Sequence, residues 1–268
     1  MHLVKSLENE HRSAALEDGQ VRIGTINYYR EIEDAQRADG EEGLGKIVWC
    51  GQKLEQDNFN KIFTPFDRIQ MINGWSIENK GLPIHGSYPN FNAFVYCYSE
   101  VENAEQVAST AGGKGDSYFC IANPARFVAS VRKQLEPLIV RWLQEYAESS
   151  EKEQILKTLK ILDVNYRINY SDERKDRLVD ESNIDEFDPK AFHPQDFFQK
   201  ATSYSYEREV RTVWLPVAKH PITGDDVPLA IPAEWKFQDI NVDISALSSE
   251  LVKCKIDLKT STLKSTRS

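Results

Sequence analysis

The stretch 203–216, SYSYEREVRTVWLP, decides how this chain is expected to fold. It is rich in β-branched and aromatic residues, which favour a β-strand. Successive side chains of a strand point to opposite faces, so Glu207, Glu209 and Arg211 share a face with Val213 and Leu215. That face is polar at one end and apolar at the other, as expected for a strand that runs from a cleft into a core.

Two interpretations of the polar end are open. In the first, Glu207 and Glu209 are solvated charges on an exposed strand, and Arg211 pairs with one of them. In the second, the three side chains form the floor of an active site. The rest of the chain has to decide between the two.

The composition indicates a globular protein with a sizeable core. The chain has 268 residues, of which 40% are hydrophobic, so it can bury a core without disulfides or a structural metal. We expect a single catalytic-type domain over residues 1–258 and a disordered tail at 259–268, where the sequence KTSTLKSTRS is polar. The net charge of −9 disfavours general adhesion to nucleic acid or anionic membranes, although a local basic groove stays compatible with it.

The four cysteines are scattered and form no Cys-x-x-Cys pair, which favours buried thiols in a reducing compartment. The N-terminal stretch is too polar for a secretory signal, and no apolar run is long enough to span a membrane. These features predict a cytoplasmic protein with no membrane partner.

The remaining patterns predict an α+β fold. Asn123 and Pro124 are a good N-cap and first helical residue, and they precede an apolar stripe of helical spacing, so we expect a helical insertion at about 124–162 between strands. The expected strands are 21–26, 46–50, 92–100, 116–124 and 163–170.

A second unusual stretch, VRIGTINYYR, begins at Val21. It places Arg22 on a short strand, lets a ligand approach the backbone at Gly24, and follows with Tyr28 and Tyr29. An arginine beside paired aromatics suits a planar cation next to phosphates. The alternative is a surface salt bridge at Arg22 with both tyrosines in the core. The histidines and cysteines show no metal-ligand spacing, so we predict no metal site.

Together these stretches resemble the ADP-ribosyltransferase superfamily. VRIGT is similar to its early Arg-bearing strand, and Glu207-x-Glu209 is similar to its late Glu-bearing strand. FVYCYSE, around Tyr98 and Ser99, has the order of the middle motif. Over about residues 20–215 the chain also resembles a bacterial toxin and phage-defence family, that of toxin–antitoxin–chaperone systems. The resemblance implies a split β-sheet core, but the chain lacks a clear Ser-Thr-Ser middle motif.

The resemblance implies that NAD+ is the substrate and that ADP-ribose passes to an acceptor when nicotinamide leaves. In that chemistry Glu209 stabilises the oxocarbenium-like centre, and Glu207 orients or deprotonates the acceptor. Tyr28 or Tyr29 would stack on the nicotinamide ring. We count Tyr28 among the predicted catalytic residues and Tyr29 among the predicted binding residues.

The remaining residues of the early motif are the implied binding groups for NAD+. Arg22 would hold phosphate or ribose, and Gly24 and Thr25 would contact the nicotinamide side. Arg30 would be a further contact for pyrophosphate or acceptor. No metal is implied.

The resemblance further implies that the acceptor is RNA, with mRNA modification blocking translation, and that an antitoxin and a chaperone are partners. Two other hypotheses stay open. One is a Mg²⁺-dependent nuclease that uses Asp34, Asp39, Glu207 and Glu209. The other is a non-catalytic module whose charged strand binds a partner protein.

Overall fold

The structure, a computed structural model, describes the chain in segments. They are residues 2–7, 18–26, 28–29, 44–63, 76–78, 83–89, 93–102, 106–107, 117–146, 149–172, 177–187, 197–220, 224–229, 240–245, 251–257 and 262–266. Within these segments the fold is α+β, as the sequence predicts, with mostly antiparallel sheet and few helices.

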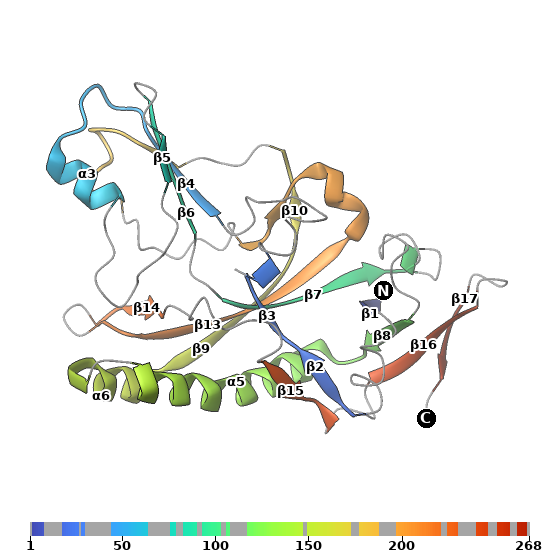
Figure 1. The fold of residues 1–268 in the computed structure, drawn as a ribbon. Coiled ribbons are helices and arrows are strands. Elements are labelled where there is room, and N and C mark those ends of the chain that lie inside the picture. The colour runs from blue at the N-terminus through green and yellow to red at the C-terminus, as the bar shows by residue number, and fades with distance from the viewer. Residues whose placement is uncertain are drawn as a thin grey trace.

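Nine of the described strands form one antiparallel sheet at the centre of the fold (Figure 1). Its order is β14-β13-β7-β1-β8-β16-β17, with β3 added to β7 and β9 added to β13. The bounds are β1 His2–Leu7, β3 Gly24–Thr25, β7 Phe94–Val101, β8 Ser117–Ile121, β9 Lys160–Arg167, β13 Glu209–Lys219, β14 Asp226–Pro228, β16 Leu251–Asp257 and β17 Thr262–Thr266.

The other described strands form three smaller sheets. A four-stranded sheet, β11-β4-β6-β5, contains β4 Leu44–Trp49, β5 Ser76–Glu78, β6 Ile84–Pro89 and β11 Arg177–Val179. It lies at the upper left of Figure 1 with α3 (Gln56–Phe63) and has a hydrophobic cluster of its own around Trp49. The two-stranded pairs are β10 (Asn169–Tyr170) with β12 (Gln199–Lys200) and β2 (Gln20–Arg22) with β15 (Asn241–Asp243).

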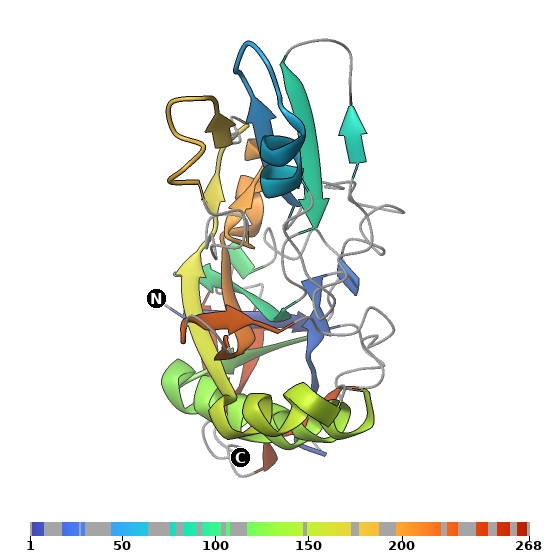
Figure 2. The same ribbon diagram turned by 90° about the vertical axis from the view of Figure 1, so that its left-hand side faces the viewer.

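The helical insertion covers one face of the central sheet, as both ribbon views show (Figures 1 and 2). It consists of α5 (Pro124–Tyr146) and α6 (Ser149–Thr158), and residues 160–162 already belong to β9. The Asn123 side chain accepts a hydrogen bond from the Arg126 backbone N–H at 3.1 Å, so the predicted N-cap is confirmed. Pro137 lies within α5.

The two faces of β13 differ as the alternation of a strand requires. Val210, Trp214 and Ala218 belong to the hydrophobic core that α5 and α6 share with the sheet. The Trp214 indole N–H donates to the Val128 carbonyl of α5 at 3.2 Å. The opposite face begins with Glu209 and Arg211 and continues into a second apolar cluster, which contains Val213, Leu215, Val217, Ile26, Phe197 and Phe198.

The stretch 203–216 is not one strand, which corrects the prediction. Residues 202–207 form the 3₁₀ helix η3 (Thr202–Glu207), and Arg208 follows with φ 46°, in the left-handed region. Asp172, distant in the sequence, accepts hydrogen bonds from the backbone N–H and the hydroxyl of Thr202. These contacts hold the first residue of the turn from a distant segment, whereas the N-cap residue Ala201 makes no side-chain capping hydrogen bond.

The structure also differs from the expected disordered tail at 259–268, because β17 pairs with β16 there. One edge of β16 pairs with β8 and its other edge offers backbone groups to residues 262–266. The threonines at both ends of β17 favour a strand, but the polar composition of the tail favoured a prediction of disorder over a strand. The single domain over 1–258 stays a prediction.

The cysteines depart from the expectation of four thiols. Cys120 is disulfide-bonded, whereas Cys50 and Cys97 are free. Disulfides persist mainly in oxidising compartments, so this bond does not support the predicted reducing environment. In the described part of the chain, no helix has the length and apolar character needed to cross a membrane.

Candidate active site

Four buried charged side chains form a cluster where β13 begins: Lys200, Glu207, Glu209 and Arg211. Their exposed fractions are 4%, 8%, 6% and 1%. Buried charges are tolerated only when they are paired, so the contacts among these four groups decide whether the charges of the cluster are compensated. The alternative in which Glu207 and Glu209 are solvated edge charges is wrong.

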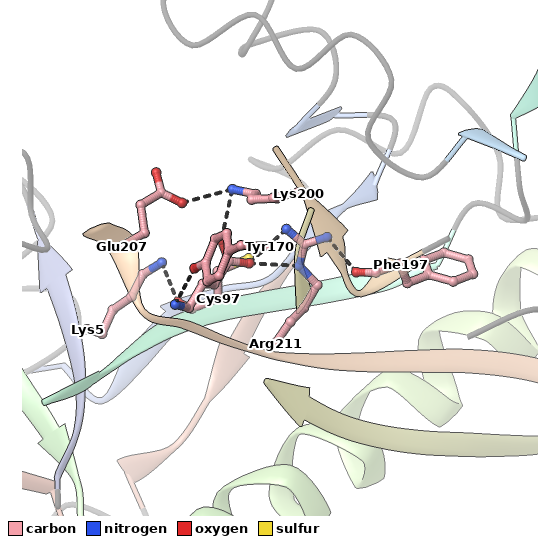
Figure 3. Close-up of polar contacts among 8 residues, drawn as sticks. Lys5, Cys97, Tyr170, Phe197, Lys200, Glu207 and Arg211 are labelled. Carbon is pink, nitrogen blue, oxygen red and sulfur yellow. Dashed lines mark hydrogen bonds and ion pairs between the residues drawn. The ribbon is translucent and has the colours of Figure 1, made fainter. Parts of the chain in front are cut away.

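Glu209 contacts both cations of the cluster, and Figure 3 labels its neighbours Lys200, Glu207 and Arg211. Its Oε1 accepts from Arg211 Nε at 2.8 Å and lies 2.7 Å from a terminal guanidinium nitrogen of Arg211. Its Oε2 lies 2.8 Å from Lys200 Nζ. Lys200 also donates to Glu207 Oε2 at 3.0 Å, so one ammonium group bridges both carboxylates.

Backbone geometry brings these side chains together from three elements. Glu209 and Arg211 are two residues apart on β13, and Lys200 lies on β12. Glu207 ends η3, and the left-handed turn at Arg208 separates it from the strand. Glu207 and Glu209 therefore meet through Lys200 rather than by sharing a strand face.

Two backbone contacts fix the cluster in place. The Arg211 guanidinium donates to the Phe197 carbonyl at 2.7 Å, beside β12. The Glu209 backbone N–H donates to the Tyr170 hydroxyl at 2.7 Å. Burial raises the pKa of Tyr170 to about 12, so its hydroxyl stays neutral at physiological pH.

Glu209 is ionised in the folded protein. Burial alone would raise its pKa, but the charges of Arg211 and Lys200 outweigh burial and hold the pKa well below the ordinary value of 4.5. Lys200 and the Cys97 thiol add hydrogen bonds that favour the carboxylate further. The site therefore holds an ionised carboxylate, compensated by two cations, in a nearly dry environment.

This lowered pKa predicts that acid destabilises the protein. The contribution of Glu209 is fully present above its unfolded-state pKa, near 4.5, and is lost as the pH falls toward its folded-state pKa. Urea unfolding midpoints at several pH values from neutral to about pH 3 should fall below pH 4.5. The Glu209→Gln variant should lose part of this acid dependence, and an unchanged dependence would contradict the assignment.

Cys97 supplies a thiol at the edge of the cluster. Burial and the nearby Glu209 carboxylate raise its pKa far above the usual thiol value. Because the thiolate is the reactive form, Cys97 should react slowly with a thiol reagent at about pH 8, and the exposed Cys50 should react fast. Mass spectrometry of the alkylated protein measures both rates, and equal rates would contradict the raised pKa of Cys97.

The tyrosine pair of the early motif lies beside the cluster, because Tyr29 packs against the apolar residues that continue from Glu209 and Arg211 along β13. Burial raises the pKa of Tyr28, and the charge of Arg22 lowers it in part. The Tyr28 and Tyr29 rings meet edge to face, 5.9 Å between centroids. Burial raises the pKa of Tyr29 well above its usual value, and the charges of Glu209 and Arg211 act on its hydroxyl. Two distant stretches of sequence thus converge.

Gly24 and Thr25 lie within the sheet. Gly24 pairs with Val95 and Thr25 with Phe94 of β7, and both residues are buried. The Thr25 hydroxyl accepts from the Tyr28 backbone N–H at 3.3 Å. In this structure they therefore support the tyrosine pair.

The outcomes for the remaining candidates differ. Arg30 lies outside the described residues, as do Asp34 and Asp39. Tyr98 of the proposed middle motif points to the helix-covered side, where its hydroxyl meets Asn165 and Thr212, each at 3.0 Å. Ser99 pairs with Glu209 across the two strands.

The gap beside β7 is a further feature of the site. Along one edge of β7, β3 pairs at residues 94–95 and β1 pairs at residues 99–101. Between these points the Lys5 ammonium donates to the Cys97 carbonyl at 2.8 Å and lies 4.9 Å from the centroid of the Tyr96 ring. Lys5 thereby satisfies a strand carbonyl in this gap and brings positive charge close to the cluster.

Sequence reasoning missed Lys200, Tyr170 and Cys97. Lys200 precedes the turn-forming segment and carries no local sign of burial, and only the β10–β12 pairing brings it to Glu209. Among the described residues, no group of three or more histidine, cysteine, aspartate and glutamate side chains could hold a metal ion.

Comparisons with protein-family models, with curated proteins and with solved structures found no match to this chain.

Proposed function

We propose that this protein is an NAD+-dependent ADP-ribosyltransferase and that the buried charge cluster at the start of β13 is its active site. The observation that carries the proposal is the buried cluster of Lys200, Glu207, Glu209 and Arg211, with the paired rings of Tyr28 and Tyr29 beside the apolar cluster that continues from it along β13. It joins a cation, two aromatic rings and fixed carboxylates, which are the groups that a dinucleotide with a cationic ring requires.

The roles of the residues follow from what each can offer NAD+. Arg22 would bind the pyrophosphate, and Tyr28 with Tyr29 would hold the nicotinamide ring. The partial exposure of these three side chains leaves them accessible to substrate. Gly24 and Thr25 would support the tyrosines from the sheet, a change from the direct contact implied by the resemblance.

The roles that we propose for Glu207 and Glu209 differ from those implied by the sequence. A carboxylate has about four acceptor sites. Those of Glu209 are engaged by Arg211, Lys200 and the Cys97 thiol. Glu207 also has partners, Lys200 among them, but it is the more exposed of the two carboxylates, with 10% of its side-chain surface accessible against 6% for Glu209. We therefore assign Glu207 to the ribose hydroxyl and Glu209 to positioning Lys200.

In the proposed reaction the bond between the ribose anomeric carbon and nicotinamide breaks, and nicotinamide leaves neutral with the bonding electrons. The positive charge that develops on the ribose is stabilised by the Glu207 carboxylate through the ribose hydroxyl. An acceptor nucleophile then bonds to the same carbon and loses its proton to water.

The family resemblance alone suggests the biological setting. It implies an RNA acceptor, an antitoxin and chaperone as partners, a cytoplasmic location and a split β-sheet core. The gap between β3 and β1 along β7 is compatible with such a core.

The test is incubation of the purified protein with labelled NAD+ and, separately, with RNA, DNA or protein as acceptor. Transfer of label, lost in Glu207→Gln and kept in the exposed-site control Glu186→Gln, is the expected result. Release of nicotinamide without transfer would make the protein a glycohydrolase. Absence of NAD+ turnover under every condition would overturn the proposal, and chelator-sensitive RNA cleavage would favour the nuclease hypothesis.

A further inference from the structure

The outer edge of β9 is the clearest unused surface of the central sheet. β9 pairs with β13 along its inner edge, and no described strand pairs with its outer edge. In Figure 2 the yellow strand lies at the margin of the molecule. Two large apolar side chains on it are exposed, Leu162 at 41% and Tyr166 at 60%. An exposed edge strand of this kind is a template for another strand.

The backbone of β9 determines which groups face outward. The Ile168 N–H donates to the Glu209 carbonyl at 3.0 Å, so residue 168 directs its backbone groups toward β13. These directions alternate along an antiparallel strand. Residues 162, 164 and 166 therefore bond to β13, and residues 161, 163, 165 and 167 direct their N–H and C=O groups away from it.

We propose that two copies of this chain associate through antiparallel pairing of β9 with β9, centred on Val164. In an antiparallel ladder, two residues that lie opposite each other either both direct their backbone N–H and C=O groups toward the other strand or both direct them away from it. An axis between two residues would pair an outward-directed residue with an inward-directed one, so the two-fold axis has to pass through a residue. Centring on Val164 overlaps residues 161–167 of both strands. Centring on residue 165 would overlap only 163–167, and centring on residue 163 would place Asp163 against itself.

The side chains of this register complement one another on both faces. On one face Leu162 lies opposite Tyr166 of the second copy, and Val164 lies opposite Val164 of the second copy. On the other face Asp163 lies opposite Asn165 of the second copy. Arg132 occupies one Asp163 oxygen, and Asn165 uses its carbonyl to accept from Tyr98, so a carboxylate oxygen and an amide NH₂ group face each other.

This inference does not depend on the proposed enzymatic activity. β9 and the charge cluster lie on the same sheet, but the paired edge of β9 is separate from Glu207 and Glu209.

Sedimentation velocity over a concentration series up to about 1 mM tests the pairing. The wild-type mass should rise from that of one 30.7 kDa chain toward twice that value. Val164→Lys places like charges together at the two-fold axis and should remain a monomer. Leu178→Lys changes a residue that is 62% exposed on β11, outside the interface, and should dimerise like the wild type. A single-chain mass throughout, or a dimer that survives Val164→Lys, would overturn the proposal.

A cross-link determines the register without relying on the stability of Val164→Lys. In a Cys50→Ser background, Val164→Cys should form a dimer on mild oxidation, because opposite residues of a non-hydrogen-bonded pair have close Cβ atoms. Leu178→Cys in the same background is the matched control and should stay uncross-linked. Equal cross-linking of the two variants would contradict pairing at Val164.

Discussion

Glu209→Gln should lower the free energy of unfolding by about 3–5 kcal/mol, because it removes the charge that compensates Arg211 and Lys200 in a buried site. Gln keeps the volume of the side chain, so the loss reports charge rather than a cavity. Urea unfolding followed by circular dichroism measures the change through its midpoint and slope.

A matched exposed pair controls for the effect of losing any carboxylate. Glu153 pairs with Lys157 on α6, and both side chains are largely exposed. Glu153→Gln should leave the midpoint almost unchanged, since exposed ion pairs contribute little. If Glu209→Gln were equally harmless, the buried cluster would not contribute to stability.

A double-mutant cycle then separates the pair from its surroundings. Arg211→Leu should also be strongly destabilising, because it removes one of the two cations that pair with Glu209 and leaves only Lys200 to compensate the buried carboxylate. The double variant Glu209→Gln with Arg211→Leu should be more stable than the sum of the single changes predicts. Additive effects would show that the two groups do not interact.

Glu207→Gln should reduce NAD+ turnover by roughly a hundredfold or more, the usual effect of removing a group that stabilises transition-state charge. We expect a smaller loss of stability than for Glu209→Gln, because Lys200 keeps its pairing with Glu209. Initial rates of nicotinamide release, measured beside the unfolding midpoint of each variant, distinguish the two effects.

The comparison of the two variants tests the division of roles. Glu207→Gln with normal turnover, beside a folded but inactive Glu209→Gln, would return the reacting role to Glu209. Lys200→Met adds a further readout, since it should reduce turnover while leaving the Glu209–Arg211 pair in place.

The sequence by itself determined the periodic parts of the protein. The β-branched and aromatic residues of 209–216 predicted the strand that β13 forms, and the Asn123-Pro124 signal with its helical stripe predicted α5. Such patterns are local, because burying one face of a strand or helix requires apolar residues at a fixed spacing. The polar-to-apolar change along the Glu209 face and the Glu209–Arg211 pair were predictable for the same reason.

Only the tertiary structure decided how the site is assembled. Asp172 bonds the first residue of the helical turn at 202–207 from a distant segment, and the bridge between the two carboxylates depends on Lys200, which β12 brings to β13. The packing of Tyr29 against the apolar cluster on β13 joins segments that are far apart in the sequence. A contact between distant segments is not tied to a fixed spacing along the chain, so it leaves no periodic signal in the sequence. Its interaction energy becomes large only when folding excludes water from both partners.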